Sequence, residues 1–168
     1  IRSDFNIDYD RLIFSQSFRK LGGKTQVHPL ADNDIVHTRL THSLETASVG
    51  RSLGMIVGDF LLYKENISRD ELSVHDIATI VQTACLLHDL GNPPFGHAGE
   101  DAIKNWFMDF VENNSYLNDN LDEGCLEELK YFDGNAQGLR ISTKLENNFN
   151  KGGMNLTITT LASMIKYP

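Results

Sequence analysis

The chain has 168 residues, of which 40% are apolar, and a formal net charge of −8. This length suits a single domain, and no apolar run approaches the roughly 18 residues that a membrane-spanning helix requires, so we expect a soluble protein that does not enter a membrane. The two cysteines, Cys85 and Cys125, lack the spacing of a metal site or a disulfide framework, which favours a reducing compartment, the cytoplasm.

Acidic residues are concentrated in the middle of the chain. Residues 59–133 carry 16 Asp or Glu and 4 Lys or Arg, whereas residues 1–52 carry 7 basic and 6 acidic residues. The middle should therefore repel long polyanions, although a nucleic-acid face elsewhere stays open. A phosphate-bearing substrate would have to be small, or its charge would have to be neutralised by a metal ion and local cations such as Lys20, Arg39 and Lys166.

The first half of the chain is predicted to form helices joined by short loops. A weak helical pattern covers 8–20, "KLGGK" (20–24) is typical of a loop, and strand-like residues are limited to a few near "TQVHP". From 37 to about 63, four apolar residues and one histidine recur at three-, four- and seven-residue steps, which predicts the buried face of a helix. These positions are His42, Val49, Leu53, Ile56 and Phe60.

The next helix is predicted to begin at "SVHD" (73–76), where a serine hydroxyl and an acid three residues later form a capping box. Its apolar positions again follow the 3.6-residue period, and the same face brings His88 inward beside Ala84 and Val81. The periodic positions are Ile77, Ile80, Val81, Ala84 and Leu87.

Gly91 and the pair Pro93 and Pro94 should end this helix, because proline lacks an amide donor and restricts the residue before it. A further helix is predicted from about 97 to 111, and the polar stretch 112–124 is predicted to be a loop. Weaker helical patterns follow at 124–131, 135–148 and 157–166, with a loop at 150–155. The sequence therefore predicts an all-α fold.

His42, His88 and Asp89 form the first candidate site. His88 and Asp89 can converge on an ion at the end of their helix, and His42 joins them from the interior face of another helix. Two imidazoles and a carboxylate suit zinc, iron, manganese and related ions, with open positions for water. A single inward histidine is more often a hydrogen-bonded core residue, but three buried ionisable groups are costly unless something pairs them, which favours a metal site.

His97 and Glu100 form a second candidate pair at the start of the next helix. They are three residues apart, so they share a helix face. Glu100 can orient or charge the imidazole, and His97 can then move a proton to or from a water or a leaving oxygen. The alternative is a routine contact of a helix-start glutamate with the helix dipole.

Several motifs follow one another in a specific order along the chain. They are "RSDFNIDYDRLIFSQSFRKLGGKTQVHPL", "HTRLTHSLETASVGRSLG", "HDLGNPPFGHAGE", "FDGNAQGLRI" and "LASMIKYP". Together they closely resemble the deoxyguanosine triphosphate triphosphohydrolase family of the HD superfamily, over almost the whole chain apart from the stretches near 62–72 and 112–130. An isolated His-Asp pair would be weak support, whereas this ordered set is highly specific.

The resemblance implies a helical HD fold in which His42, His88 and Asp89 hold a divalent ion (Mn²⁺, Mg²⁺ or another transition metal), with His97 and Glu100 assisting catalysis. Family members cleave a deoxynucleoside triphosphate, here most simply dGTP, in one step to the deoxynucleoside and inorganic triphosphate, and they often form homo-oligomers. The motif positions also imply substrate contacts: Gln26 and Asn135 to the nucleoside, Arg39 and Lys166 to phosphates, and Tyr167 near the sugar.

Arg39 offers a planar, permanently charged fork that suits a phosphate, the alternative being a surface ion pair.

The family's metal site also has a fourth ligand, an Asp downstream of the segment that matches "MIKYP", and the sequence stops before it. Because the sequence also begins at Ile1, we expect residues 1–168 to be an HD-type phosphohydrolase domain from which the C-terminal helices are missing.

Two other functions stay open from the sequence. One is another HD phosphohydrolase, a nucleotidase or a phosphodiesterase, against which "GNAQG" and the His97 and Glu100 pair argue. The other is a non-catalytic HD module that binds nucleotide and responds through assembly.

Overall fold

The computed structural model describes residues 2–27, 33, 35–68, 72–147 and 152–166, which are mainly helical. The elements in chain order are α1 (Asp4–Ile13), α2 (Gln16–Lys20), the 3₁₀ turn η1 (Leu21–Gly23), α3 (Arg39–Lys64), α4 (Val74–Leu87), α5 (His97–Glu112), α6 (Ser115–Asn120), α7 (Glu123–Lys130), α8 (Gly134–Arg140), the π-helical turn η2 (Ile141–Leu145) and α9 (Ile158–Met164). Between these described residues, extended backbone pairs only at an isolated bridge between Thr25 and Thr38. The all-α prediction is confirmed.

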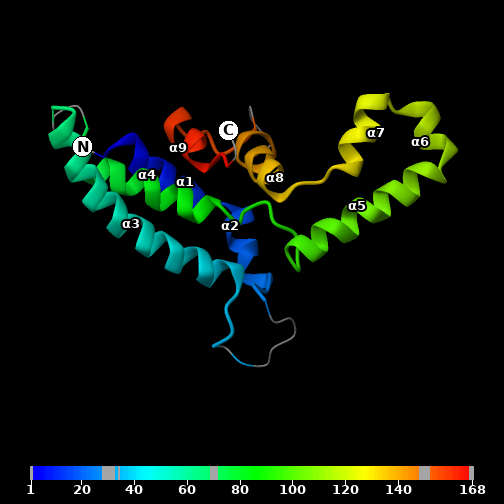
Figure 1. The fold of residues 1–168 in the computed structure, drawn as a ribbon, viewed down its shortest axis with the longest axis horizontal. Coiled ribbons are helices and arrows are strands. Elements are labelled where there is room, and N and C mark those ends of the chain that lie inside the picture. Colours follow the sequence, from blue (N-terminus) through cyan, green and yellow to red (C-terminus); the bar gives the residue numbers. More distant parts are fainter. Residues whose placement is uncertain (1, 28–32, 34, 69–71, 148–151, 167–168) are drawn as a thin grey trace.

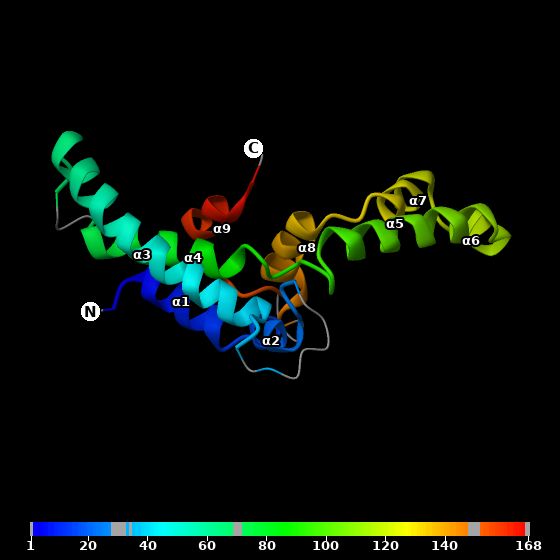
Figure 2. The ribbon, with the colours of Figure 1, turned by 60° about the horizontal axis from the view of Figure 1, so that its bottom comes forward.

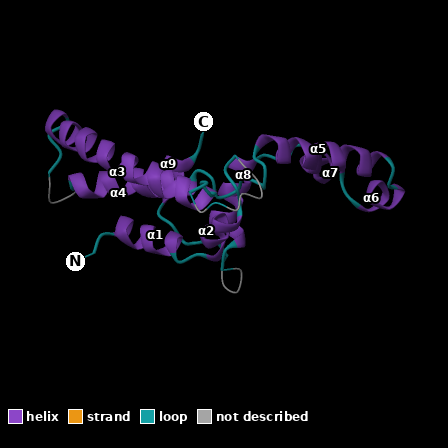
Figure 3. Cartoon of the chain, turned by 90° about the horizontal axis from the view of Figure 1, so that it is seen from below, coloured by secondary structure: helices purple, strands orange, loops and turns teal. Residues whose placement is uncertain are grey.

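Helix α4 lies at the centre of the fold. It runs antiparallel to α3 (Figure 1), and α1 and α9 also pack against it. The core beneath them is formed by Leu12, Phe18, Leu21, Ala47, Leu86, Leu87, Leu90, Met154 and Leu156. The arm formed by α5, α6 and α7 extends away from this body (Figures 2 and 3). None of the helices in the described stretches combines the length and the apolarity needed to cross a membrane.

The buried face of α3 differs from the prediction. Val49, Leu53, Ile56 and Phe60, which were expected to be buried, are 55–70% exposed, while His42 is half-buried. The buried positions are instead Arg39, Ser43, Ala47, Gly50, Gly54, Gly58 and Leu62. The predicted stripe is thus an exposed apolar stripe on the opposite side of the helix, and the prediction of its burial was wrong.

Small residues explain this reversal, because they let the backbones of α3 and α4 approach each other. A Cβ atom at Gly50 would lie 2.5 Å from Cys85 Sγ, and one at Gly54 would lie 2.8 Å from Ala78 Cα. A larger side chain at either position would separate the helices. Close packing of backbone against backbone therefore decides which face of α3 is buried. Hydrophobic periodicity alone does not reveal this packing, because it is made by glycines.

Helix α4 begins where the sequence predicts. The Ser73 hydroxyl accepts a hydrogen bond from the amide of Asp76, and the Asp76 carboxylate accepts one from the amide of Ser73 at 3.1 Å. The helix ends at Leu87 with His88 as its C-cap. Of the five apolar positions predicted on the inward face, Leu87 is buried, while Ile77, Ile80, Val81 and Ala84 are half-buried. Ala78, Thr83 and Leu86, which the periodicity did not select, are buried as well, because α4 has neighbours on several sides.

Three other boundaries differ from the predicted ones. The single helix expected over 8–20 is two helices, because Ser15 caps α2 by accepting a hydrogen bond from the amide of Phe18. The loop predicted at 112–124 contains α6, and the helix predicted at 135–148 changes from α8 to the π-helical turn η2 at Ile141. Predicted helices at 97–111, 124–131 and 157–166 are present to within a few residues.

Candidate functional site

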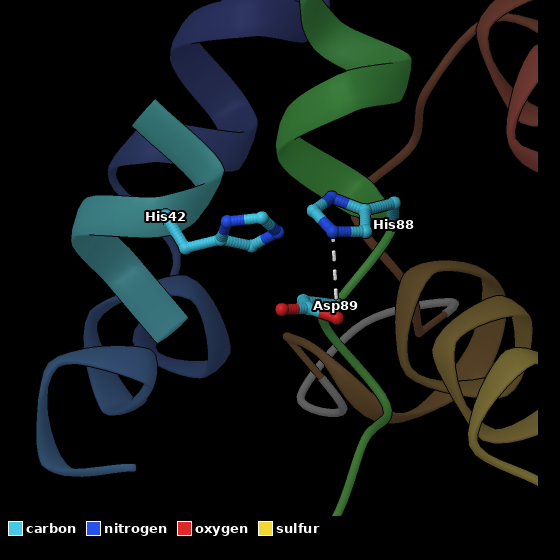
Figure 4. A group of neighbouring side chains, drawn as sticks. All are labelled: His42, His88 and Asp89. Atoms are coloured by element: carbon cyan, nitrogen blue, oxygen red, sulfur yellow. Dashed lines mark ion pairs between the residues drawn. The ribbon is translucent and has the colours of Figure 1, made fainter. Parts of the chain in front are cut away.

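Three candidate metal ligands from two helices meet at the end of α4 (Figure 4). His42 lies in the second turn of α3, His88 caps α4, and the buried Asp89 follows directly. One donor atom from each residue lies within 4.8 Å of the other two, and the imidazole centroids of His42 and His88 are 5.2 Å apart. The structure therefore brings together the three residues that the sequence predicted as metal ligands.

His88 is held in the form that a metal requires. Its Nδ1 lies 2.6 Å from the carbonyl oxygen of Cys85, and because a carbonyl only accepts, Nδ1 must carry the proton. When the ring binds a metal, the other nitrogen, Nε2, supplies the lone pair, and this atom lies 3.4 Å from Asp89 Oδ1. A hydrogen bond of this kind fixes both the tautomer and the orientation of a histidine ligand.

Asp89 is a buried carboxylate that accepts a hydrogen bond on Oδ1 and has an ion-pair contact, without a well-aligned hydrogen bond among the described residues, on Oδ2. Arg39 Nη1 lies 3.0 Å from Oδ2, with both side chains only 5% exposed, and the Asn92 side-chain amide donates to Oδ1 at 2.6 Å. A buried carboxylate needs such compensation, since an unpaired charge away from water is costly. The contact between Arg39 and Asp89 is buried. Arg39 therefore does not form the surface ion pair that was the alternative interpretation of the sequence.

The three residues fit a divalent cation. Two ligands about 2.1 Å from one ion can be at most about 4.2 Å apart. The 4.8 Å limit on the donor separations is close to this, so a small side-chain rotation brings all three donors within reach of one ion. Neutral imidazoles and a carboxylate are accepted by zinc, manganese and iron alike.

Lys24 is a second cation at this site, and the sequence did not single it out. Its Nζ donates to the main-chain carbonyl of Asn92 at 2.9 Å. Burial and the neighbouring Arg39 lower the pKa of Lys24, while the Asp89 carboxylate acts in the opposite direction. Lys24 is half-buried and lies in an irregular segment, so no helical periodicity marks it. The only signal in the sequence is that its "KTQV" context belongs to a segment that resembles the family.

His97 and Glu100 form the predicted pair at the start of α5. His97 Nδ1 lies 3.1 Å from Glu100 Oε2, so the ring donates to the carboxylate and its Nε2 faces outward on a fully exposed side chain. Glu100 is 7% exposed, and its Oε1 accepts a hydrogen bond from the amide of Gly134 at 2.9 Å. Glu100 thus also links α5 to α8.

Glycines allow the loops around the site to pack closely. A Cβ atom at Gly134 would lie 2.3 Å from Asn92 Oδ1 and 2.6 Å from Glu100 Oε1. A Cβ atom at Gly91 would lie 2.1 Å from both the Gly134 carbonyl oxygen and the Gly138 amide nitrogen. The two glycines of "GNAQG" therefore place the start of α8 against the turn that follows Asp89.

The remaining candidate residues lie in two separate places. Asn135 and Lys166 line one cavity of about 210 Å³, next to the Gly134 contact with Glu100. Gln26 lines another cavity of about 280 Å³, together with Val36 and neighbouring residues, and its buried Oε1 has no hydrogen-bond partner among the described residues. Tyr167, predicted to lie near the sugar, is outside the described residues.

The described residues form a helical domain in which two histidines and an aspartate from adjoining helices converge. This arrangement defines a class of helical domains with a His–His–Asp site, and sequence comparison assigns the chain to the same class. Residues 39–129, more than half of the chain, match the family model of the HD domain. The matched span contains His42, His88 and Asp89. The chain therefore belongs to the HD domain family.

Curated relatives match almost the whole chain. A Pseudomonas aeruginosa protein named deoxyguanosinetriphosphate triphosphohydrolase-like protein is 52% identical over 171 residues, which cover 99% of this chain. Proteins with the same name from Listeria monocytogenes and from a Synechocystis species are 45% and 46% identical, over 100% and 99% of the chain. The chain spans 37–38% of the length of these relatives. The resemblance inferred from the motifs is confirmed.

Proposed function

We propose that this chain carries the metal-binding and proton-transfer residues of a deoxynucleoside triphosphate triphosphohydrolase, which cleaves dGTP to deoxyguanosine and inorganic triphosphate. The observation that carries the proposal is the convergence of His42, His88 and Asp89, with His88 Nε2 3.4 Å from Asp89 Oδ1. The names of the relatives support the choice of substrate.

His42, His88 and Asp89 would hold the divalent cation. A cation bound there would make a water molecule more acidic and would offset the charge that builds on the phosphate oxygens. Arg39 would add a permanent positive charge beside it. Its Nη1 is engaged by Asp89, and its buried Nε has no partner among the described residues. We assign the guanidinium to a phosphate from the family resemblance and its permanent charge.

In the proposed reaction, the oxygen of a water molecule bonds to the α-phosphorus and the bond from this phosphorus to the 5′-oxygen breaks. The leaving 5′-oxygen takes a proton, for which His97 Nε2 is the proposed donor. Glu100 Oε2 accepts a hydrogen bond from the opposite ring nitrogen and so orients the imidazole. The attacking water loses a proton to solvent, and the products are the deoxynucleoside and triphosphate.

The other residues would bind the substrate. Asn135 and Lys166 line one cavity, and we assign Asn135 to the nucleoside and Lys166 to a phosphate. We assign Gln26, whose buried Oε1 lacks a partner among the described residues, to the nucleoside as well, and Tyr167 to the sugar. These four assignments rest on the family resemblance.

Product analysis tests the proposal. The protein as it is encoded would be incubated with dGTP and Mn²⁺, and triphosphate, pyrophosphate and phosphate would be separated by chromatography. We expect triphosphate and deoxyguanosine, lost in His88→Ala and retained in His75→Ala, which alters an exposed histidine at the other end of α4. Pyrophosphate with the monophosphate would contradict the proposal and indicate another HD phosphohydrolase. Nucleotide binding without turnover would indicate a binding module.

A further inference from the structure

Four residues from three segments of the chain form a closed ring of contacts that includes the candidate metal ligand Asp89. The amide of Arg39 donates to the carbonyl of Lys24 at 2.8 Å, and Arg39 Nη1 pairs with Asp89 Oδ2 at 3.0 Å. The side chain of Asn92 donates to Asp89 Oδ1 at 2.6 Å. Lys24 Nζ closes the ring by donating to the carbonyl of Asn92 at 2.9 Å.

The ring joins the two parts of the chain that supply the metal ligands. On one side of the ring, Arg39 precedes His42 by less than one turn of α3, and the carbonyl of Lys24 accepts the hydrogen bond from the Arg39 amide. The other side, Asp89 and Asn92, follows directly from His88 at the end of α4. The ring therefore links the start of α3, which bears His42, to the turn that bears Asp89, in addition to the direct packing of α3 against α4.

Asn92 acts on the oxygen of Asp89 that faces His88. Its amide donates to Oδ1, the atom 3.4 Å from His88 Nε2, and so sets the direction of the carboxylate. The residue type matters, because an amide donates without adding charge, whereas a carboxylate at position 92 would place two negative groups within hydrogen-bonding distance. Lys24 in turn fixes the backbone of Asn92.

We propose that Asn92 and Lys24 are positioning residues of the metal centre, which hold Asp89 and the start of α3 in the arrangement that binds the cation. This inference rests on the proposed metal binding and adds two residues to it. Neither residue touches the ion. Asn92 acts through Asp89, and Lys24 acts one step further away, through the backbone of Asn92. Loss of a residue that orients a metal ligand typically weakens metal affinity about 10–100-fold.

Mn²⁺ affinity in the absence of nucleotide tests the inference. Free Mn²⁺ would be measured by electron paramagnetic resonance while the protein as it is encoded is titrated. We expect Asn92→Ala to weaken Mn²⁺ binding about 10–100-fold. Asn105→Ala, which removes an exposed asparagine of α5, is the matched control and should bind like the wild type. The melting temperature without metal is recorded for each variant, since a role in stability alone would lower it and leave affinity unchanged.

Lys24 needs a pair of variants, because removing its charge also reduces repulsion of the cation. Lys24→Gln keeps a hydrogen-bond donor and Lys24→Met has none, while both lack the charge. We expect Lys24→Gln to bind Mn²⁺ more tightly than Lys24→Met, and the exposed Lys144→Met to match the wild type. Equal affinity of the two Lys24 variants would remove Lys24 from the proposal. If Asn92→Ala does not fold, the difference in Mn²⁺ affinity between Lys24→Gln and Lys24→Met tests the positioning role of the ring in its place.

The two proposals fail in different ways. A wild-type protein that binds no Mn²⁺ would refute the metal centre itself. A wild-type protein that binds Mn²⁺, with Asn92→Ala folded and equally tight, would refute the positioning role and leave the metal centre standing.

Discussion

Arg39 and Asp89 form a buried ion pair, with Nη1 and Oδ2 3.0 Å apart and both side chains 5% exposed. The pair connects the first residue of α3 to the turn after α4. It thus serves two purposes, since it compensates the charge of a candidate metal ligand and joins the two helices that bear the ligands.

Replacement of Arg39 should therefore destabilise the fold. In Arg39→Met the Asp89 carboxylate would stay buried without its ion-pair partner, and breaking a buried pair in this way costs about 3–5 kcal/mol. Urea unfolding followed by circular dichroism, without metal, measures the loss. Arg19→Met, at an exposed position of α2, should change the free energy of unfolding by no more than about 0.5 kcal/mol. Equal stability of the two variants would show that Asp89 gains water when Arg39 is removed.

Gly134 should not tolerate a side chain. A Cβ atom there would lie 2.3 Å from Asn92 Oδ1 and 2.6 Å from Glu100 Oε1, so Gly134→Ala would displace both. We expect a loss of about 1–3 kcal/mol in the free energy of unfolding, as for other overpacked sites, together with lower turnover of dGTP. Gly23→Ala is the control, because a Cβ atom at Gly23 meets nothing within 4 Å. If both variants behave alike, the close packing of α8 against the turn is not required.

Glu100→Gln separates the two functions of Glu100. The amide oxygen can still accept the hydrogen bond from Gly134, so the fold should persist, whereas the negative charge beside His97 Nδ1 is lost. We expect turnover to fall about 10²–10⁴-fold, the range of general acid–base contributions, while Mn²⁺ affinity and melting temperature stay unchanged. Turnover close to that of the wild type would remove the pair from the proposed proton transfer. A loss of Mn²⁺ binding would show that Glu100 supports the metal centre instead.

The capping box of α4 should weaken in acid. Burial acts to raise the pKa of Asp76, but the hydrogen bonds from Ser73 and Ser3, with a smaller contribution from His75, together outweigh it and hold this pKa below its ordinary value. A depressed folded-state pKa contributes stability above the unfolded-state value, and this contribution is lost as the pH falls through the folded-state value. Ser73→Ala should lower the free energy of unfolding by about 1 kcal/mol at pH 7.

The difference between wild type and Ser73→Ala should shrink as the pH drops below about 4, the ordinary pKa of aspartate. Denaturant unfolding at pH 7, 5 and 3.5 follows this trend. Ser52→Ala, on an exposed face of α3, provides a reference with no pH-dependent difference. A constant difference across the three values would mean that the Asp76 carboxylate plays no part in the cap.

Local signals in the sequence predicted the helices but not how they pack. The hydroxyl at position 73 and the prolines after Gly91 act through neighbouring residues, so the limits of α4 followed from them. The exposure of Leu53 and Ile56 depends instead on how closely Gly54 can approach Ala78 on another helix. Hydrophobic periodicity treats every apolar residue as buried and every glycine as neutral, and α3 violates both assumptions.

The candidate site shows the same division. His88 and Asp89 are adjacent in the sequence, and the metal chemistry of such residues led to His42 as their partner, which the structure places within reach. Lys24 and Asn92 carry no comparable signal, because their importance arises from contacts between residues far apart in the chain. The roles of the individual residues in substrate binding and proton transfer stay predictions.

The exposed apolar stripe on α3 also affects how the stability of these 168 residues can be measured. Dyes that fluoresce in apolar surroundings usually bind a loosened state more strongly than a native one. Here Val49, Leu53, Ile56 and Phe60 offer such a dye a continuous strip on the folded molecule, so fluorescence should be high before any unfolding occurs. A dye-based melting curve would then begin from a raised baseline, and helical circular dichroism is the better optical signal for the chain.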